Sequence, residues 1–147
     1  MTVKHRNPIL VIIFWFITAG IYGIYWLIST ASELKRLKAK NAPEPIWVLW
    51  ILLCSLGGII LLIAGIVMMA FLLAIGLPSL LIGMLLIIVA VVLSIIFYWR
   101  YSLAIDYISK GEYNYILLFV FWIIFSPVSV VLSQLALNRI AKKKRKK

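Results

Sequence analysis

The chain has 147 residues, of which 65% are hydrophobic, and it carries a formal net charge of +11. A soluble domain is closer to half apolar, so this composition excludes a water-soluble fold. We predict an all-α integral membrane protein with a single domain, 1–147. Every charged residue lies outside three uncharged runs, 7–32, 45–99 and 113–138. The positive charge therefore belongs to tails and loops and predicts contact with anionic lipid headgroups, whereas nucleic acid is an unlikely partner.

The first predicted segment, 8–40, begins with an apolar run over 9–28. As a helix this run would be about 30 Å long, which matches the hydrocarbon core of a bilayer. Gly20 and Gly23 permit a break instead, because glycine tolerates turn geometry. The run can therefore either span the membrane or enter and return. The polar stretch 29–40 predicts a short amphipathic helix in the headgroup plane. The polar stretch after Arg100 predicts another short helix, on which Asp106 and Lys110 can pair.

The second predicted segment, 46–110, is a transmembrane helical hairpin. Its apolar run, 46–99, would form a helix of about 80 Å, which is far longer than a bilayer is thick. The run must fold back, and Gly76–Ser79 contains the strongest turn signal within it. Folding at that turn would place Ala70 opposite Gly83, where small side chains let helices approach closely.

The third predicted segment, 113–140, holds another apolar run, which is broken at Ser126–Pro127 because proline removes a helix hydrogen bond. A linker with two prolines, 41–45, separates the first two segments, and a basic tail, 139–147, ends the chain. Aromatic residues of the kind found at membrane interfaces flank the apolar runs: Tyr25, Trp26, Trp47, Trp50, Tyr98 and Trp99.

The segments share a pattern that suggests a threefold internal repeat. Residues 25–33 align with 98–106 through identical Tyr, Trp, Ser and Ala, and Glu33 then meets Asp106. A weaker third copy ends at Asn138. Each copy has an apolar helix, a glycine or proline break, and a polar exit, and repeats of this kind are common in membrane folds. The central hairpin would thus be flanked by two broken apolar helices.

Charge distribution distinguishes between the two topologies. If all four apolar helices span, nine Lys and Arg lie on one side and six on the other, which is a weak bias by the positive-inside rule. If the first and third segments are re-entrant, all fifteen basic residues lie on one side, facing the cytoplasm. We favour the re-entrant topology, in which packing against protein covers the breaks.

Three motifs stand out along the chain: an opening motif, a Tyr-Trp-Arg-Tyr exit at 98–101, and Gln134 followed by Asn138. The opening motif comprises Arg6, Asn7, Pro8, Thr18, Gly20, Tyr22, Tyr25, Trp26, Glu33 and Leu34. Together these motifs resemble a prokaryotic membrane-protein family called domain of unknown function 4234. The resemblance implies a place in the cell membrane but no activity, because the family has none assigned.

Residues suited to catalysis or to metal binding are scarce. The single histidine, His5, lies in a basic tail, and Cys54 lies alone in an apolar run. No Cys/His metal spacing and no phosphate loop occurs, and no charge lies inside an apolar run to mark an ion path. We therefore expect no enzyme activity, no metal and no cofactor.

Two groups of residues remain as candidate sites. The repeated exits suggest a polar cluster at the cytoplasmic interface, although three independent helix-end polar residues are the simpler interpretation. The members of the suggested cluster are Glu33, Arg36, Arg100, Asp106, Asn138 and Arg139. The basic tail predicts an anchor to anionic lipid or a topology signal: Lys142, Lys143, Lys144, Arg145, Lys146 and Lys147.

These features favour a small multi-pass membrane protein that contacts lipids or serves as an accessory or scaffold for other membrane proteins or for further copies of itself. The alternative is an oligomeric transporter or pore component, since one copy has few helices. An enzyme that acts on lipid is a third interpretation, for which the chain offers no catalytic constellation.

Overall fold

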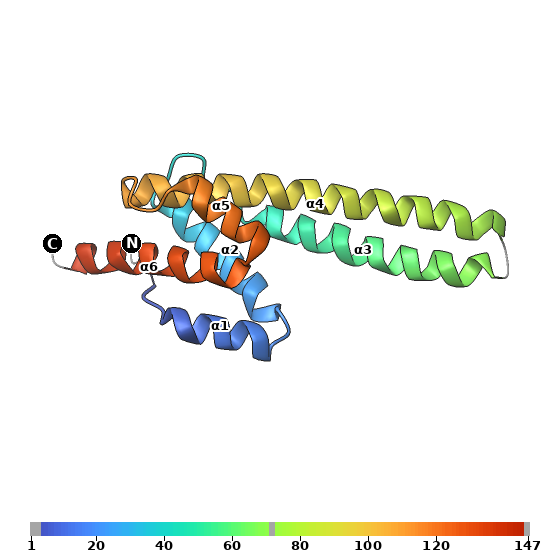
Figure 1. Ribbon diagram of the computed structural model, residues 1–147, viewed down its shortest axis with the longest axis horizontal. Helices are drawn as coiled ribbons and strands as arrows, with labels where there is room; N and C mark the ends of the chain where they lie inside the picture. The colour runs from blue at the N-terminus through green and yellow to red at the C-terminus, as the bar shows by residue number, and fades with distance from the viewer. Residues whose placement is uncertain (1–3, 71–72, 146–147) are drawn as a thin grey trace. The chain divides into compact units, whose positions relative to one another are not determined.

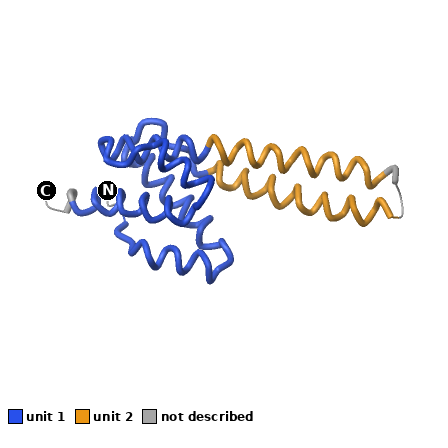
Figure 2. The backbone as a smooth tube through the Cα atoms, in the orientation of Figure 1, with its two compact units in different colours: residues 1–45, 97–147 blue, residues 46–96 orange. Residues whose placement is uncertain are grey.

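The computed structural model describes residues 4–70 and 73–145, which form six α-helices and no strand (Figure 1). This confirms the predicted all-helical fold. The chain divides into two compact units, unit 1 with residues 1–45 and 97–147, and unit 2 with residues 46–96 (Figure 2). The helices are α1 (Pro8–Ile17), α2 (Ile21–Arg36), α3 (Ile46–Met69), α4 (Leu73–Ser109), α5 (Tyr115–Ile124) and α6 (Ser126–Arg145).

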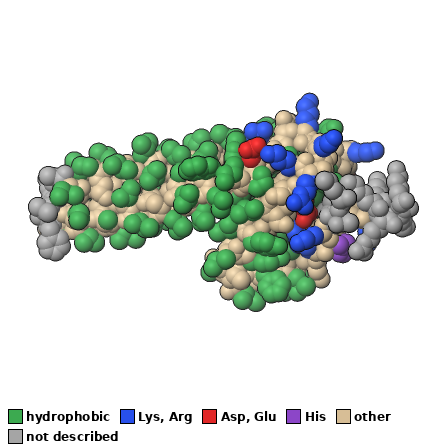
Figure 3. Space-filling model, turned by 180° about the vertical axis from the view of Figure 1, so that it is seen from behind, with side chains coloured by type: hydrophobic (Ala, Val, Ile, Leu, Met, Phe, Trp, Pro, Cys, Tyr) green, Lys and Arg blue, Asp and Glu red, His purple; other side chains and the backbone are tan. Residues whose placement is uncertain are grey.

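Unit 2 is an antiparallel pair formed by α3 and the first part of α4 (Figure 2). Both helices are long and apolar enough to cross a membrane. They contain no charged residue between Ile46 and Ile96, and large apolar side chains are exposed around the pair (Figure 3). A helix that is apolar on all sides requires either a protein core or a lipid environment.

The structure corrects the predicted turn at Gly76–Ser79, because α3 ends at Met69 and α4 already begins at Leu73. Those four residues lie within the first two turns of α4. Proline is tolerated near a helix start, where few of its missing hydrogen bonds would have formed. Gly76 serves close packing rather than a turn, because a Cβ there would lie 2.5 Å from the backbone nitrogen of Met69.

The new register also changes which small residues meet across the hairpin. A Cβ on Gly83 would lie 2.9 Å from the carbonyl oxygen of Gly58, so Gly83 faces α3 at Gly58 instead of at Ala70. Gly65 approaches the carbonyl oxygen of Gly76 in the same way. The Ser79 hydroxyl adds a hydrogen bond of 2.9 Å to the carbonyl oxygen of Leu61. Glycine thus allows the two backbones to pack closely, as small residues do in membranes.

In unit 1, α1 and α2 fold back on each other at Thr18–Gly20 (Figure 1). Ala19 and Gly20 both have positive φ, and Gly20 N–H donates to the carbonyl of Trp15, so α1 ends in a Schellman motif. The break lies where the glycine pattern predicted it. The Thr18 hydroxyl joins the two helices, since it donates to Phe14 O and accepts from the amide of Tyr22.

The second hairpin of unit 1 joins α5 and α6 at Phe125. Pro127 lies in the first turn of α6, where its missing N–H has little cost. The Ser129 hydroxyl donates to Leu118 O at 3.0 Å, which holds α6 against α5. Both hairpins begin alike, because Asn7 caps α1 and Asn114 caps α5 with a side-chain oxygen.

Two predicted short helices are parts of longer ones. The polar stretch after Ile28 continues α2 to Arg36, and residues 100–109 continue α4. Neither Ser29 nor Arg100 ends its helix, because one face of the helix stays buried beyond these residues. Ala31 and Ala104, which follow these residues, are fully buried.

An aromatic cluster forms the core of unit 1. Tyr98 stacks on Trp122 with ring centroids 4.6 Å apart, and Tyr101 meets the same indole edge-on at 5.7 Å. Trp26 lies 6.4 Å from Trp122 and is fully buried. Trp26 and Tyr98 therefore pack inside the protein rather than marking an interface, while Trp50 is 55% exposed. Burial of such rings contributes strongly to stability.

Candidate functional site: a buried polar cluster in unit 1

Arg6 is the centre of a polar cluster that joins the N-terminal tail to α2 and α6. Its guanidinium Nη2 donates to Ser29 Oγ at 2.7 Å and to Glu33 Oε1 at 3.0 Å. The side chains of Arg6 and Glu33 are only 12% and 9% exposed. An ion pair this poorly hydrated needs both partners, because a lone buried charge is strongly unfavourable.

The backbone of Arg6 is held equally firmly by α6. Its amide donates to Asn138 Oδ1 at 3.1 Å, and its carbonyl accepts from Asn138 Nδ2 at 2.7 Å. A carboxamide that meets both groups of one residue fixes the direction of the chain there. Asn138 therefore sets the point at which the tail enters α1.

Gln134 extends the cluster into the aromatic core. Its Nε2 donates to Asn138 Oδ1 at 2.9 Å, and its Oε1 accepts from Trp26 Nε1 at 2.8 Å. Gln134 and Trp26 are both fully buried. A continuous chain of hydrogen bonds thus runs from the Trp26 indole through two carboxamides to Arg6 and Glu33. Buried polar groups that are joined in this way specify one packing arrangement.

Two atoms of the cluster make no hydrogen bond within the described part of the protein. These are Arg6 Nη1 and Glu33 Oε2, both of which are buried. Arg6 Nη2 and Glu33 Oε1 are engaged by short contacts, so the cluster mainly links the N-terminal tail to α2. Among residues 4–70 and 73–145, no group of three His, Cys, Asp or Glu lies close enough to hold a metal ion.

The predicted interfacial cluster is only partly brought together. Glu33 and Asn138 both contact Arg6, whereas Arg139 lies apart. Its guanidinium pairs with Glu112 and lies 5.9 Å from the centre of the Tyr113 ring. This contact links the end of α6 to the chain just before α5.

The other predicted members occupy separate places in unit 1. Arg100 Nε donates to the carbonyl of Asn41 in the linker at 3.4 Å. Arg36 is exposed at the end of α2, and Asp106 is half-buried on α4. The basic tail is described only in part, with Lys142 exposed, and its last two residues lie outside the described part of the chain.

The family-like motif is dispersed over the first hairpin. Thr18 and Gly20 form its bend, and Tyr22 packs 5.4 Å from the Phe14 ring. Tyr25 is 52% exposed, and Leu34 is fully buried. Of the whole opening motif, Arg6, Trp26 and Glu33 join the polar cluster.

Sequence reasoning missed Arg6 as the centre and Gln134 as its link to the core. A signal for Gln134 was present, because it is a carboxamide inside an apolar run and a buried amide requires a partner. Arg6 belongs to the opening motif, but nothing in the sequence pairs it with Glu33 or Asn138, because it lies in a basic tail next to Lys4 and His5.

The exposed pair Lys35–Glu44 lies outside this cluster. The ammonium donates to Glu44 Oε1 at 2.9 Å. This hydrogen bond, together with the charges of Lys35 and Arg100, holds the pKa of the Glu44 carboxyl below its usual value. It joins the end of α2 to the linker before α3.

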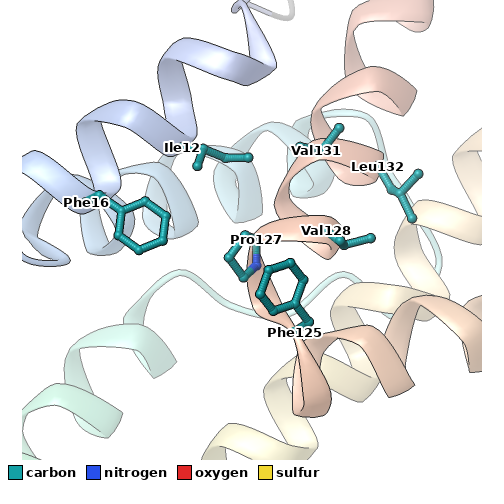
Figure 4. Close-up of a pocket in the computed structure, with 7 residues that line it drawn as sticks. All are labelled: Ile12, Phe16, Phe125, Pro127, Val128, Val131 and Leu132. Atoms are coloured by element: carbon teal, nitrogen blue, oxygen red, sulfur yellow. The ribbon is translucent and has the colours of Figure 1, made fainter.

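An apolar groove of about 340 Å³ lies in unit 1 between α1 and α6 (Figure 4). Its lining offers no polar atom, so it suits a hydrocarbon group and not a polar ligand. The lining residues are Ile12, Phe16, Phe125, Pro127, Val128, Val131 and Leu132.

Comparisons with protein-family models, with curated proteins and with solved structures find no match. The family resemblance therefore stays a prediction, and the site is described by its own geometry.

Proposed function

We propose that the chain is a small, non-enzymatic multi-pass membrane protein that contacts anionic lipids and serves as an accessory or scaffold within the membrane. In this proposal α3 and α4 span the bilayer, while α1–α2 and α5–α6 enter from one side and return. The main support for this topology is that an arginine–glutamate ion pair joins the two polar ends of each short hairpin.

In the first hairpin, Arg6 precedes α1 and Glu33 lies in the last turns of α2, yet their side chains are 3.0 Å apart. As one straight helix, the 27 residues between them would separate these groups by about 40 Å. Their ion pair supports a topology in which the tail and the exit of α2 share one side of the membrane.

The second hairpin is closed in the same way. Arg139 near the end of α6 pairs with Glu112 just before α5. The Phe125 side chain at the bend is apolar and 56% exposed, which suits contact with lipid tails, whereas the backbone of the bend requires cover from protein at that depth. The charged groups at 112 and 139 suit the headgroup region.

This topology brings all fifteen basic residues to one side, in accordance with the positive-inside rule. Figure 3 shows Lys and Arg side chains gathered on unit 1, beside exposed apolar side chains of the same unit. We propose that this basic side faces the cytoplasm and contacts anionic headgroups, each basic residue near the surface contributing about 1 kcal/mol. We propose a prokaryotic cell membrane, which is what the family resemblance implies.

The repeat remains part of the proposal. It is supported by Ala31, Ala104 and Ala136, which occupy equivalent positions and are all buried. Each lies in the second helix of its hairpin, α2, α4 or α6, and packs inside the protein, as equivalent positions of a repeat would.

Lipid contact is tested by the lipids that stay bound during purification in mild detergent. We expect less phosphatidylglycerol with a variant in which glutamine replaces each of residues 142–147, because the tail loses six positive charges. A comparison variant replaces Lys38 and Lys40 with glutamine and should lose less phosphatidylglycerol, because it removes two positive charges rather than six. An unchanged phosphatidylglycerol content in the tail variant would contradict the proposed lipid contact.

A further inference from the structure

Helices α1 and α5 have the composition of membrane-inserted segments but only half the required length. Each has ten residues, which gives about 15 Å, whereas the hydrocarbon core is about 30 Å thick. Both are apolar on every side, without the polar face that keeps an amphipathic helix in the headgroup plane. Their exposed side chains are Ile9, Leu10, Ile13, Phe14, Phe16, Ile17, Ile116, Leu117, Val120, Ile123 and Ile124.

A charged group precedes each of these helices, and in the topology proposed above it fixes the start of the helix on the basic side. Arg6 precedes α1 and is paired with Glu33, and Glu112 precedes α5 and is paired with Arg139. A helix of 15 Å that starts in the headgroup region ends near the bilayer midplane. The bends at Gly20 and Phe125 then return α2 and α6 to the same side.

We propose that the protein is a leaflet wedge, which prefers and promotes membrane curvature that is convex on its basic side. This inference rests on the re-entrant topology proposed above. By chain topology, all six helices enter the leaflet on the basic side, and only α3 and α4 reach the other leaflet. At about 100 Å² of cross-section per helix, the excess is about 400 Å² in one leaflet. The excess area strains the leaflet that contains it. This strain is relieved when that leaflet lies on the convex side of a curved membrane, and membrane-inserted helices are known to respond to curvature.

The test uses the full chain in giant phosphatidylcholine vesicles from which a narrow tube is pulled outward. Cys54 is replaced by alanine, and a single cysteine is introduced by Lys38→Cys or, in a second protein, by Ala70→Cys. Lys38 lies on the basic side and Ala70 at the reversal between α3 and α4. A membrane-impermeant fluorescent maleimide added outside marks only those molecules whose cysteine faces outward.

We expect the Lys38→Cys protein to be enriched about twofold on the tube relative to the flat membrane, because its wide leaflet lies outside. The Ala70→Cys protein, whose marked molecules point the other way, should be depleted on the tube. Equal densities on the tube and on the flat membrane for both proteins would overturn the wedge.

A third protein, with Lys4→Cys, separates failure of the wedge from failure of the topology. Labelling of Lys4→Cys and Lys38→Cys from the same side retains the re-entrant topology, so that equal tube densities then reject only the wedge. Labelling of these two from opposite sides would overturn both the wedge and the topology on which it rests.

Discussion

At the scale of single residues, Arg6 is the residue that joins the most distant parts of unit 1. It lies outside every helix, but its guanidinium and backbone connect α2 to α6. The sequence indicated that Glu33 and Asn138 belong together, because both end a copy of the repeat. It gave no reason to choose Arg6 over Arg36, Arg100 or Arg139 as their partner. That choice depends on how the first hairpin folds back, which is a tertiary effect.

Replacing Arg6 with alanine should destabilise unit 1 by about 3 kcal/mol, because Glu33 then stays buried without a counter-charge. Chemical denaturation in detergent micelles, followed by tryptophan fluorescence, measures this loss. Lys4→Ala is the matched control, since Lys4 is exposed in the same tail and should change stability by less than about 0.5 kcal/mol. Equal stabilities of the two variants would contradict the role of Arg6.

The exposed pair Lys35–Glu44 makes a prediction about pH. The lowered pKa of Glu44 means that its ion pair stabilises the fold above the usual carboxyl pKa, and that this contribution is lost as pH falls through the folded-state pKa. Lys35→Ala should raise the pKa of Glu44 toward its usual value, as measured by an NMR titration of the side-chain carboxyl. Lys38→Ala should leave it unchanged, and a Glu44 pKa insensitive to Lys35 would refute the assignment.

At the scale of helices, three helices end with the same hydrogen-bond pattern. α1, α2 and α4 close with Schellman hydrogen bonds, and their left-handed residues are Ala19, Lys38 and Lys110. Only the glycine after Ala19 and the one after Lys110 were visible as sequence signals. The bends in both short hairpins were predictable because glycine and proline act locally. The turn in the long hairpin was misplaced, since Gly76 and Pro78 fit inside a helix when close packing requires a glycine.

Glycines in unit 2 provide a direct test of that packing. Gly83→Ala should destabilise the hairpin by about 1–3 kcal/mol, because its Cβ would lie 2.9 Å from backbone atoms of Gly58 and Leu62. Gly57→Ala is the control, since its Cβ would meet only the Leu86 side chain at an ordinary 3.7 Å. Alanine is the better helix former there by about 1 kcal/mol.

Thermal melting of both variants in micelles, monitored by circular dichroism, distinguishes these two effects. A lower midpoint for Gly83→Ala together with an equal or higher one for Gly57→Ala supports the observed register. The reverse order would instead favour the register predicted from the turn at 76–79.

At the scale of the molecule, composition and the length of the apolar run 46–99 predicted the all-helical fold and the long apolar hairpin. It could not predict that Trp26 and Tyr98 lie in a core, because interface aromatics and core aromatics look alike in a sequence. The polar cluster was half predicted, through Glu33 and Asn138. Its other half depends on contacts more than a hundred residues apart, such as Trp26 with Gln134.

The central claim is that both short hairpins return to the side from which they enter. Sealed vesicles that hold single-cysteine variants in the Cys54→Ala background test it, with labelling by a membrane-impermeant maleimide from outside. Each vesicle preparation is first sorted for one orientation by antibody capture of a C-terminal tag. The account predicts that Lys4→Cys, Lys38→Cys and Lys110→Cys all label from the side of the tag, and that Ala70→Cys labels only from the other side. Labelling of Lys38→Cys from the side of Ala70 would contradict it.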